Sequence, residues 1–176
     1  MKELSLNILD ITENSVKAGA SLTEISIAET KDRLTIAIKD DGCGMSEETV
    51  KAVVDPFYTT RTTRKVGMGV PLFKMAAEQT GGRLEILSST GEDHGTMVTA
   101  YFHKDHLDFT PLGDVISTII TLIQGHPDTD FLFMHFIDEK EIRLDTRELR
   151  TVLDGVPLST YDVLEWIRGY LEEQYS

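Results

Sequence analysis

Asp40, Gly42 and Gly44 follow a segment whose pattern predicts a buried strand. Apolar and polar residues alternate over residues 34–38, and the carboxylate and the glycines come directly after that alternation. An aspartate at a strand end can accept a hydrogen bond from a ligand amino group, and glycine allows positive φ and close approach of the backbone. The spacing therefore predicts a ligand pocket at the end of this strand.

Asp10 and Asn14 form a second polar pair, within a segment of helical periodicity. The i, i+4 spacing puts both side chains on one helix face, as a single metal–phosphate centre requires. Glu13 is a neighbouring acid, but it should project from a different face, so we rank it below Asp10. A merely amphipathic helix would leave Asn14 unexplained.

These residues, with Gly67–Gly69 and Gly95-Thr96 after them, resemble in order and distance the nucleotide-binding boxes of the GHKL ATPases. That family includes gyrase-type topoisomerases, large heat-shock chaperones, histidine kinases and MutL proteins. The resemblance covers about the first 103 residues. It implies the Bergerat fold, an α/β two-layer sandwich whose mixed sheet carries helices on one face. It also implies ATP or ADP as ligand, with Mg²⁺.

The resemblance implies roles for the first helix. Asp10 stands where the family's Glu orients or deprotonates the attacking group, and Asn14 stands where the side-chain oxygen ligates Mg²⁺. Residues 15–20, which include Lys17, are similar to the continuation of this motif in MutL-like members. Asp10 is one methylene shorter than Glu, and misplacement by about an angstrom can cost roughly 100-fold in rate.

The resemblance also implies an adenine site and a lid. Asp40 is expected to accept from the adenine amino group beside Gly42, Gly44 and Met45, with Thr96 supporting it from a neighbouring strand. Residues 55–61 resemble the segment that introduces the lid of histidine kinases. The expected lid and phosphate residues are Phe57, Thr60, Arg61, Lys65, Gly67, Met68, Gly69 and Val70. A solvated basic loop is the alternative, and the flanking boxes favour a lid that neutralises the triphosphate.

The periodicity predicts the elements that position these residues. Residues 3–18 read as a helix stopped by Gly19, and residues 23–28 and 33–39 as an antiparallel pair. Ser46 should cap a short helix. Further along the chain, the pattern predicts a helix over residues 70–80 and strands over residues 83–88 and 96–103.

We divide the chain into a nucleotide-binding domain, residues 1–106, and a small α+β extension of unknown role, residues 107–176. The extension should contain a helix from Val115, a hairpin over residues 131–144 and two further helices. Asp145 with Glu148, and Ser159 with Asp162, fit the capping box of those two helices. We expect this tail to pack on the first part, with Phe131, Phe133 and Phe136 filling a core.

Composition limits the function classes. The chain has 176 residues, 40% of them hydrophobic, and a formal charge of −13, which opposes binding to nucleic acid or an anionic membrane. Cys43 is the only cysteine, so an internal disulfide is excluded. No apolar run approaches membrane-spanning length. We expect a cytoplasmic protein.

Two functions from different classes remain open. The first is a stand-alone kinase or ATPase of the histidine-kinase or anti-sigma type, which acts on a separate protein partner or phosphoacceptor. The sequence leaves open whether it forms a homodimer. The second is a nucleotide-sensing interaction module with little or no phosphotransfer. None of the five histidines lies in a recognisable acceptor helix, so we do not expect a complete autophosphorylating histidine kinase.

Overall fold

The computed structural model describes residues 3–55 and 68–176. Within them, all strands join one six-stranded sheet, in the order β3-β4-β2-β1-β5-β6. Its strands are β1 (Leu22–Glu29), β2 (Arg33–Asp40), β3 (Arg83–Ser89), β4 (Gly95–His103), β5 (Asp130–Ile137) and β6 (Lys140–Asp145). The helices are α1 (Leu4–Lys17), α2 (Glu47–Val53), α4 (Gly69–Glu78), α5 (Val115–Gly125), α6 (Thr146–Leu153) and α7 (Tyr161–Tyr175).

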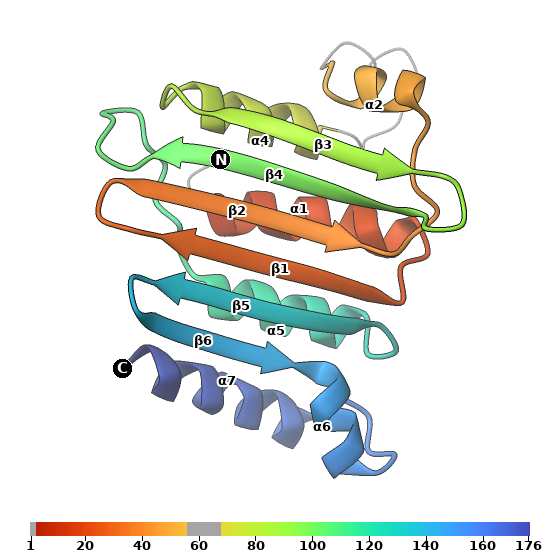
Figure 1. Cartoon of the computed structure of the whole chain (residues 1–176). Coiled ribbons are helices and arrows are strands. Elements are labelled where there is room, and N and C mark those ends of the chain that lie inside the picture. Colours follow the sequence, from red (N-terminus) through yellow and green to blue (C-terminus); the bar gives the residue numbers. More distant parts are fainter. Residues whose placement is uncertain (1–2, 56–67) are drawn as a thin grey trace.

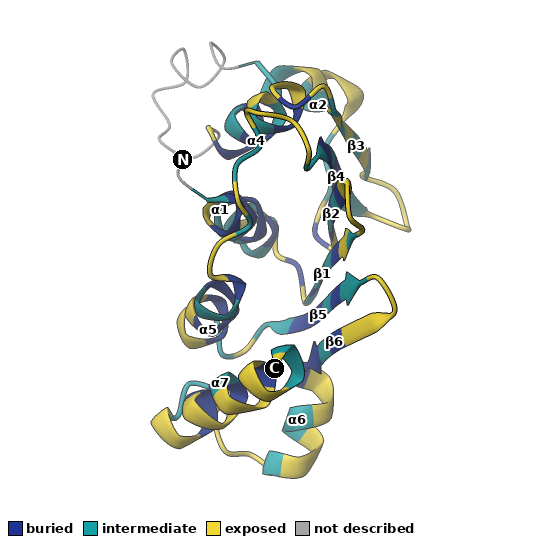
Figure 2. Cartoon of the chain, turned by 90° about the vertical axis from the view of Figure 1, so that its left-hand side faces the viewer, coloured by how far each residue is buried: buried dark blue, intermediate teal, exposed yellow. Residues whose placement is uncertain are grey.

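The sheet is mixed, because β1 and β5 run parallel while every other neighbouring pair of strands is antiparallel. Helices α1, α4, α5 and α7 lie side by side on one face of it, as the edge-on view shows (Figure 2). The other face carries no helix of the described chain. The expected two-layer α/β sandwich is confirmed.

Helix α1 sits in the middle of the helical layer and forms the centre of the core (Figure 1). Its apolar residues recur at helical spacing, and Leu4, Ile8 and Ile11 are buried against strand residues such as Ile25 and Ile36. The helix ends before Gly19, whose φ of +81° is a conformation that favours glycine. The helix predicted from the sequence is confirmed and its polar face is held toward the end of β2.

The predicted strands and their hairpin pairing are also confirmed. β1 pairs with β2, and β3 pairs with β4, both antiparallel. Ser46 caps α2, its hydroxyl accepting from the Thr49 N–H at 3.2 Å. β4 crosses back to pair with β2, which places Thr96 opposite Asp40.

The C-terminal segment packs on the first part, as expected, by extending the same sheet. β5 lies parallel beside β1, and α5 packs against α1 (Figure 1). Phe131 and Phe133 are fully buried, whereas Phe136 is only half-buried.

A buried polar network also joins the two segments. His135 contacts a Glu29 carboxylate oxygen through Nε2 at 2.5 Å and the Tyr175 hydroxyl through Nδ1 at 2.6 Å. Lys104 pairs with the other Glu29 oxygen at 2.8 Å. Burial lowers the pKa of His135 in spite of Glu29, so the imidazole is held neutral within this cluster.

The capping predictions in the extension were wrong in detail. Thr160, rather than Ser159, occupies the N-cap of α7, and its side chain makes no capping hydrogen bond. Asp145 does cap α6, by accepting from the Arg147 N–H, but Glu148 pairs with Arg143 instead of completing a box. Strand β6 places Arg143 within reach of Glu148, and an ion pair with a full charge competes well with a bond to a backbone N–H.

Candidate functional site

A cavity of about 230 Å³ lies between α1, the end of β2 and the start of α4. Helix α2 also contributes to it, through Val53. Its lining residues come from every motif of the first segment that the structure describes. They are Ile11, Asn14, Ser15, Ala18, Asp40, Gly44, Met45, Val53, Val70, Thr96 and Val98.

Asp40 supplies the buried carboxylate of the cavity. It ends β2 and is 9% exposed. Its Oδ1 accepts from the Gly42 N–H at 2.9 Å, which leaves Oδ2 as the acceptor for a ligand. Gly42 itself is required here, because a Cβ would stand 2.9 Å from the Ala18 Cβ. The side chain is thus fixed in one orientation before any ligand arrives.

Asp41, the next residue, has a different task. Its Oδ1 accepts from the backbone N–H groups of Ser21 and Leu22 at 2.7 and 3.1 Å, and its Oδ2 accepts from the Ser21 hydroxyl. Burial opposes its ionisation, but these hydrogen bonds together lower the pKa of Asp41. Asp41 therefore anchors the start of β1 and faces away from the cavity.

The Ser88 hydroxyl, which the sequence analysis did not single out, links two residues of the cavity lining. The Met45 N–H donates to Ser88 Oγ at 2.7 Å, and Ser88 Oγ lies 2.7 Å from Thr96 Oγ1. Ser88 also donates to the Gly95 carbonyl at 3.1 Å, so Thr96 is the donor of their shared bond. Thr96 consequently keeps its acceptor capacity beside Asp40.

Gly44 is the residue of this loop with the least freedom to change. Its φ is +76°, and a Cβ there would overlap the Ser89 carbonyl. His94 supports the same loop from the β3–β4 turn, its Nδ1 donating to the Gly42 carbonyl at 2.5 Å. His94 is exposed, and through this bond it also stabilises the loop.

Asp10 and Asn14 lie on one face of α1, as the spacing predicts, and the start of α4 faces them. A Cβ on Gly69 would stand 3.2 Å from the Asp10 Cβ and 3.9 Å from Asn14 Nδ2. The Asn14 side chain makes no hydrogen bond with another residue of the described chain, so its oxygen is available as a ligand. The first N–H groups of α4, at Gly69 and Val70, have no acceptor within the helix.

Electrostatics distinguish Asp10 from Glu13. Burial raises the pKa of Asp10, the negative charge of Glu13 adds to this, and Lys17 opposes it. Glu13 is not a cavity residue: His126, at the end of α5, contacts both of its carboxylate oxygens at 2.9 and 3.0 Å. The structure therefore leaves Asp10 as the acid that faces the start of α4.

Of the remaining expected site residues, some line the cavity and others do not. Lys17 and Met68 are exposed and do not line the cavity, although both adjoin it in sequence. Val70 lines it. The expected lid residues Phe57, Thr60, Arg61, Lys65 and Gly67 lie outside the described residues.

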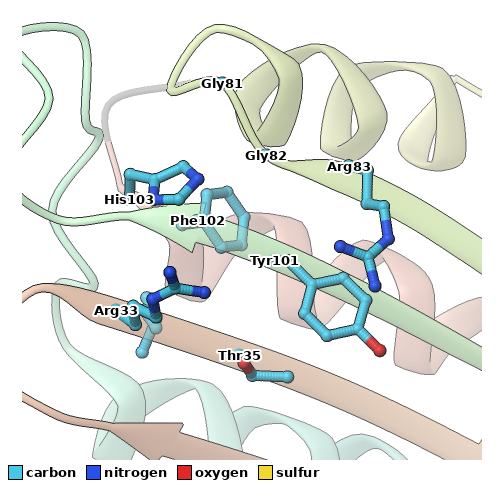
Figure 3. A pocket seen from close by; sticks show the side chains of 9 residues that line it. Arg33, Thr35, Gly81, Gly82, Arg83, Tyr101, Phe102 and His103 are labelled. Atoms are coloured by element: carbon cyan, nitrogen blue, oxygen red, sulfur yellow. The ribbon is translucent and has the colours of Figure 1, made fainter.

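A second, smaller hollow of about 130 Å³ lies at the opposite end of β2, where Arg33 begins the strand that Asp40 ends. Figure 3 shows Arg33 and Arg83 on the strands that flank β4, with Tyr101 and His103 on β4 between them. The Arg83 guanidinium stacks over the Tyr101 ring, 4.0 Å from its centroid. This hollow is separate from the cavity at Asp40.

The cavity fits an adenine nucleotide with a magnesium ion. Apolar walls from Ile11, Val53 and Val98 suit a flat base, and Asp40 offers an acceptor at its buried end. Asn14 offers a neutral oxygen at the side where α4 begins. Mg²⁺ keeps several waters and takes few ligands from protein when phosphates supply the others, so a single amide oxygen is sufficient.

Sequence comparisons agree with this geometry. A sequence model of the family described as "Histidine kinase-, DNA gyrase B-, and HSP90-like ATPase" matches residues 2–106. Sporulation kinase C of Bacillus subtilis is 32% identical over 92 residues, which is 52% of this chain and 21% of the relative. Sensor histidine kinase YxdK of the same organism is 32% identical over 108 residues, 57% of this chain and 33% of the relative. The chain thus spans a third or less of the length of these relatives.

Solved structures of similar fold include the following two. The N-terminal domain of a DNA repair protein aligns with a TM-score of 0.62 and 15% identity, over 82% of this chain and 53% of that one. The Aquifex aeolicus MutL ATPase domain complexed with ADP aligns with a TM-score of 0.53 and 17% identity, over 88% and 70%. At such identities the likeness shows the fold alone. Because the family model matches more than half of its residues, the chain belongs to the histidine kinase-, DNA gyrase B- and HSP90-like ATPases.

Proposed function

We propose that the protein is an Mg-ATP-binding regulatory protein of the histidine-kinase or anti-sigma type, which acts on a separate protein partner. The observation that carries the proposal is the cavity in which Asp40, Asn14 and the start of α4 converge. Kinases among the relatives, such as sporulation kinase C, support a regulatory role.

The polar residues in and beside the cavity each have a role in this proposal. Asp40 holds the adenine amino group through Oδ2, with Thr96 accepting a bond from the base or from a water beside it. Asn14 ligates the metal, and the N–H groups at the start of α4 bind the phosphates. ATP, when bound, supplies the phosphoryl group, and Mg²⁺ screens its charge. Asp10 orients or deprotonates the attacking group.

The alternative is a nucleotide-sensing module with little phosphotransfer. The short side chain of Asp10 favours it, since Asp10 extends less far from α1 than the Glu of the family. In that case ATP and ADP differ in their effect on a partner rather than in their turnover. Both functions require the same nucleotide site and a separate protein partner.

Asn14→Ala is expected to remove the extra affinity that Mg²⁺ gives to ATP, while metal-free ADP binds nearly as well as it does to the parent. The reason is that Asn14 offers the ligand oxygen but lies on the α1 wall, away from the base-binding carboxylate. Calorimetric titration with and without Mg²⁺ measures both affinities. Leu6→Ala, which changes an exposed residue of the same helix, serves as control.

Two outcomes would contradict this assignment of Asn14. If the variant loses the same affinity with and without metal, its effect is on the fold or the base. If it loses nothing in either condition, another residue ligates the ion and the proposal for α1 fails.

Transfer of label from γ-labelled ATP separates the two functions. The parent, incubated with labelled Mg-ATP and a lysate of the source organism, is expected to label a partner band if it is a kinase. Asp10→Asn, which keeps the nucleotide site, is the matched control and should leave that band unlabelled. A parent that binds ATP tightly but labels no band and releases no phosphate is a sensing module.

A further inference from the structure

An apolar groove of about 410 Å³ lies between α6 and α7, at the C-terminal end of the chain. Leu149, Val152 and Leu153 form its α6 wall, and Val163 and Trp166 form its α7 wall. Helices α6 and α7 lie at the β6 edge of the sheet, whereas the elements that line the nucleotide cavity, α1, α2, α4, β2 and β4, lie between the centre of the sheet and its β3 edge (Figure 1). Nothing in the proposed nucleotide chemistry uses these residues.

Large apolar side chains of the groove are exposed to solvent. Val152 is 81% exposed and Trp166 is 52% exposed. Tyr170 stacks on Trp166 one turn further along α7, with ring centroids 4.9 Å apart, and extends the apolar surface. Contiguous apolar patches with aromatic residues mark protein interaction sites, and Trp and Tyr are enriched among the residues that dominate binding energy.

The charges around the groove are unbalanced. Both arginines of α6 already form ion pairs within the chain, Arg147 with Asp145 and Arg150 with Asp130. The acids beside the groove form no ion pair within the described part of the chain. They are Asp154, which follows Leu153 at the end of α6, and Asp162 and Glu165, which share one face of α7. The groove therefore has an apolar floor and an acidic rim.

We propose that this groove, the α6–α7 groove, binds an amphipathic helix of a protein partner whose apolar stripe is flanked by lysines and arginines. An apolar stripe at i, i+3, i+4 and i+7 fits a groove between two helices, and basic flanks pair with the acidic rim. A second copy of this chain fits less well. In a two-fold symmetric contact the same acids would face one another, in a chain whose formal charge is already −13.

This inference deepens the proposed function, because it names the chemistry of the separate partner, and to that extent it rests on it. The binding event itself does not involve the nucleotide. Peptide binding and ATP binding can therefore be measured independently, and failure of one leaves the other standing.

The probe is a phage-displayed library of random peptides of about 16 residues, roughly the length of α7. The parent is the target, and Val152→Asn is the counter-target that removes peptides bound elsewhere. Val152 is so exposed that this change should not disturb folding. Selected peptides are expected to have helical apolar periodicity and an excess of lysine and arginine.

Trp166 then reports the place of binding, since it is the only tryptophan of the chain. Titration with a selected peptide should shift its fluorescence to the blue. Val152→Asn should weaken binding about tenfold, in the range that loss of a central contact costs. The double variant Asp162→Lys, Glu165→Lys reverses the charge of the rim. It should bind a peptide in which glutamates replace the basic residues more tightly than it binds the original peptide. Leu87→Asn changes another exposed apolar residue, on β3, and should leave the affinity unchanged.

Other results overturn the proposal. Selection of no peptide, or of peptides without basic excess, removes the stated partner chemistry. Binding that leaves Trp166 unaltered places the site elsewhere. Sedimentation that finds a dimer, which Val152→Asn dissociates, makes a second copy the occupant. Val152→Asn should bind ATP as tightly as the parent does, and Asp40→Asn should bind the peptide as tightly as the parent does. A loss of ATP binding with peptide binding intact therefore concerns the nucleotide site and leaves the groove proposal standing.

Discussion

Asp40→Asn is expected to weaken the binding of ATP and of ADP by about 10- to 100-fold, the cost of an unpaired buried contact of roughly 1–3 kcal/mol. The loss should be similar for both nucleotides, with or without Mg²⁺, because Asp40 contacts the base and not the phosphates. Isothermal calorimetry measures it directly.

The structure explains why the amide cannot rescue itself by rotation. Oδ1 of Asp40 already accepts from the Gly42 N–H at 2.9 Å. If the new amide keeps its oxygen there, its NH₂ group faces the adenine amino group, donor to donor. If it rotates, the NH₂ group faces the Gly42 N–H, and the loop loses its anchor. Either orientation leaves a donor without an acceptor in a buried position.

Asp41→Asn is the matched control for Asp40→Asn. Both oxygens of Asp41 are occupied by Ser21 and Leu22, so this change should lower the thermal midpoint and alter nucleotide affinity little at temperatures where the protein is folded. If the effects are exchanged, so that Asp41→Asn abolishes binding and Asp40→Asn does not, the pocket has been assigned to the wrong aspartate.

The helices and strands of this fold could be predicted from the sequence, and so could the ends of the elements that carry the site. Residues 33–39 alternate in polarity because one face of β2 is buried against α1 and the other is not, so the strand and its final aspartate could be recognised locally. Gly19 and Ser46 mark helix ends for reasons confined to a few residues. Such signals need no knowledge of the tertiary structure.

Contacts between distant segments could not be predicted in this way. β5 lies parallel beside β1, although more than a hundred residues separate them, and a parallel pair leaves no turn signal between its strands. Ser88 and Met45 meet across 43 positions, so no local pattern marks Ser88 as a residue of the site. The partner of Glu13, His126, lies 113 positions away.

The capping box predicted at Asp145 and Glu148 is incomplete for a related reason, although Asp145 does cap α6. A capping box is a local pattern, but Glu148 has a competing partner in Arg143, which β6 brings to it. A local rule holds only where tertiary contacts offer no stronger alternative.

Asp10→Asn is expected to reduce the rate of phosphotransfer or hydrolysis by about 100-fold or more, while nucleotide affinity stays within a few-fold of that of the parent. The carboxylate acts on the attacking group, so its contribution appears in the transition state and not in ground-state binding. Single-turnover rates with saturating Mg-ATP, compared with calorimetric affinities, separate these two quantities. Equal loss of affinity and rate would instead make Asp10 a binding residue.

Asp10→Glu tests whether reach limits the parent. Gly69 has no side chain to obstruct a longer acid, whereas a Cβ added there would stand only 3.2 Å from the Asp10 Cβ, a tight contact. The variant should turn over faster than the parent if the missing methylene is what slows it. A parent without turnover that gains none from this change is a sensing module.

The pH dependence of the rate identifies which acid is responsible. Burial and the charge of Glu13 raise the pKa of Asp10 above 3.8, so the rate should rise with pH as this carboxyl ionises. Glu13→Gln removes a negative neighbour and stabilises the ionised form of Asp10, which should move that rise to lower pH while the plateau rate changes little. If Glu13→Gln abolishes the rate and Asp10→Asn does not, Glu13 is the acting acid in spite of its pairing with His126, and the two roles must be exchanged.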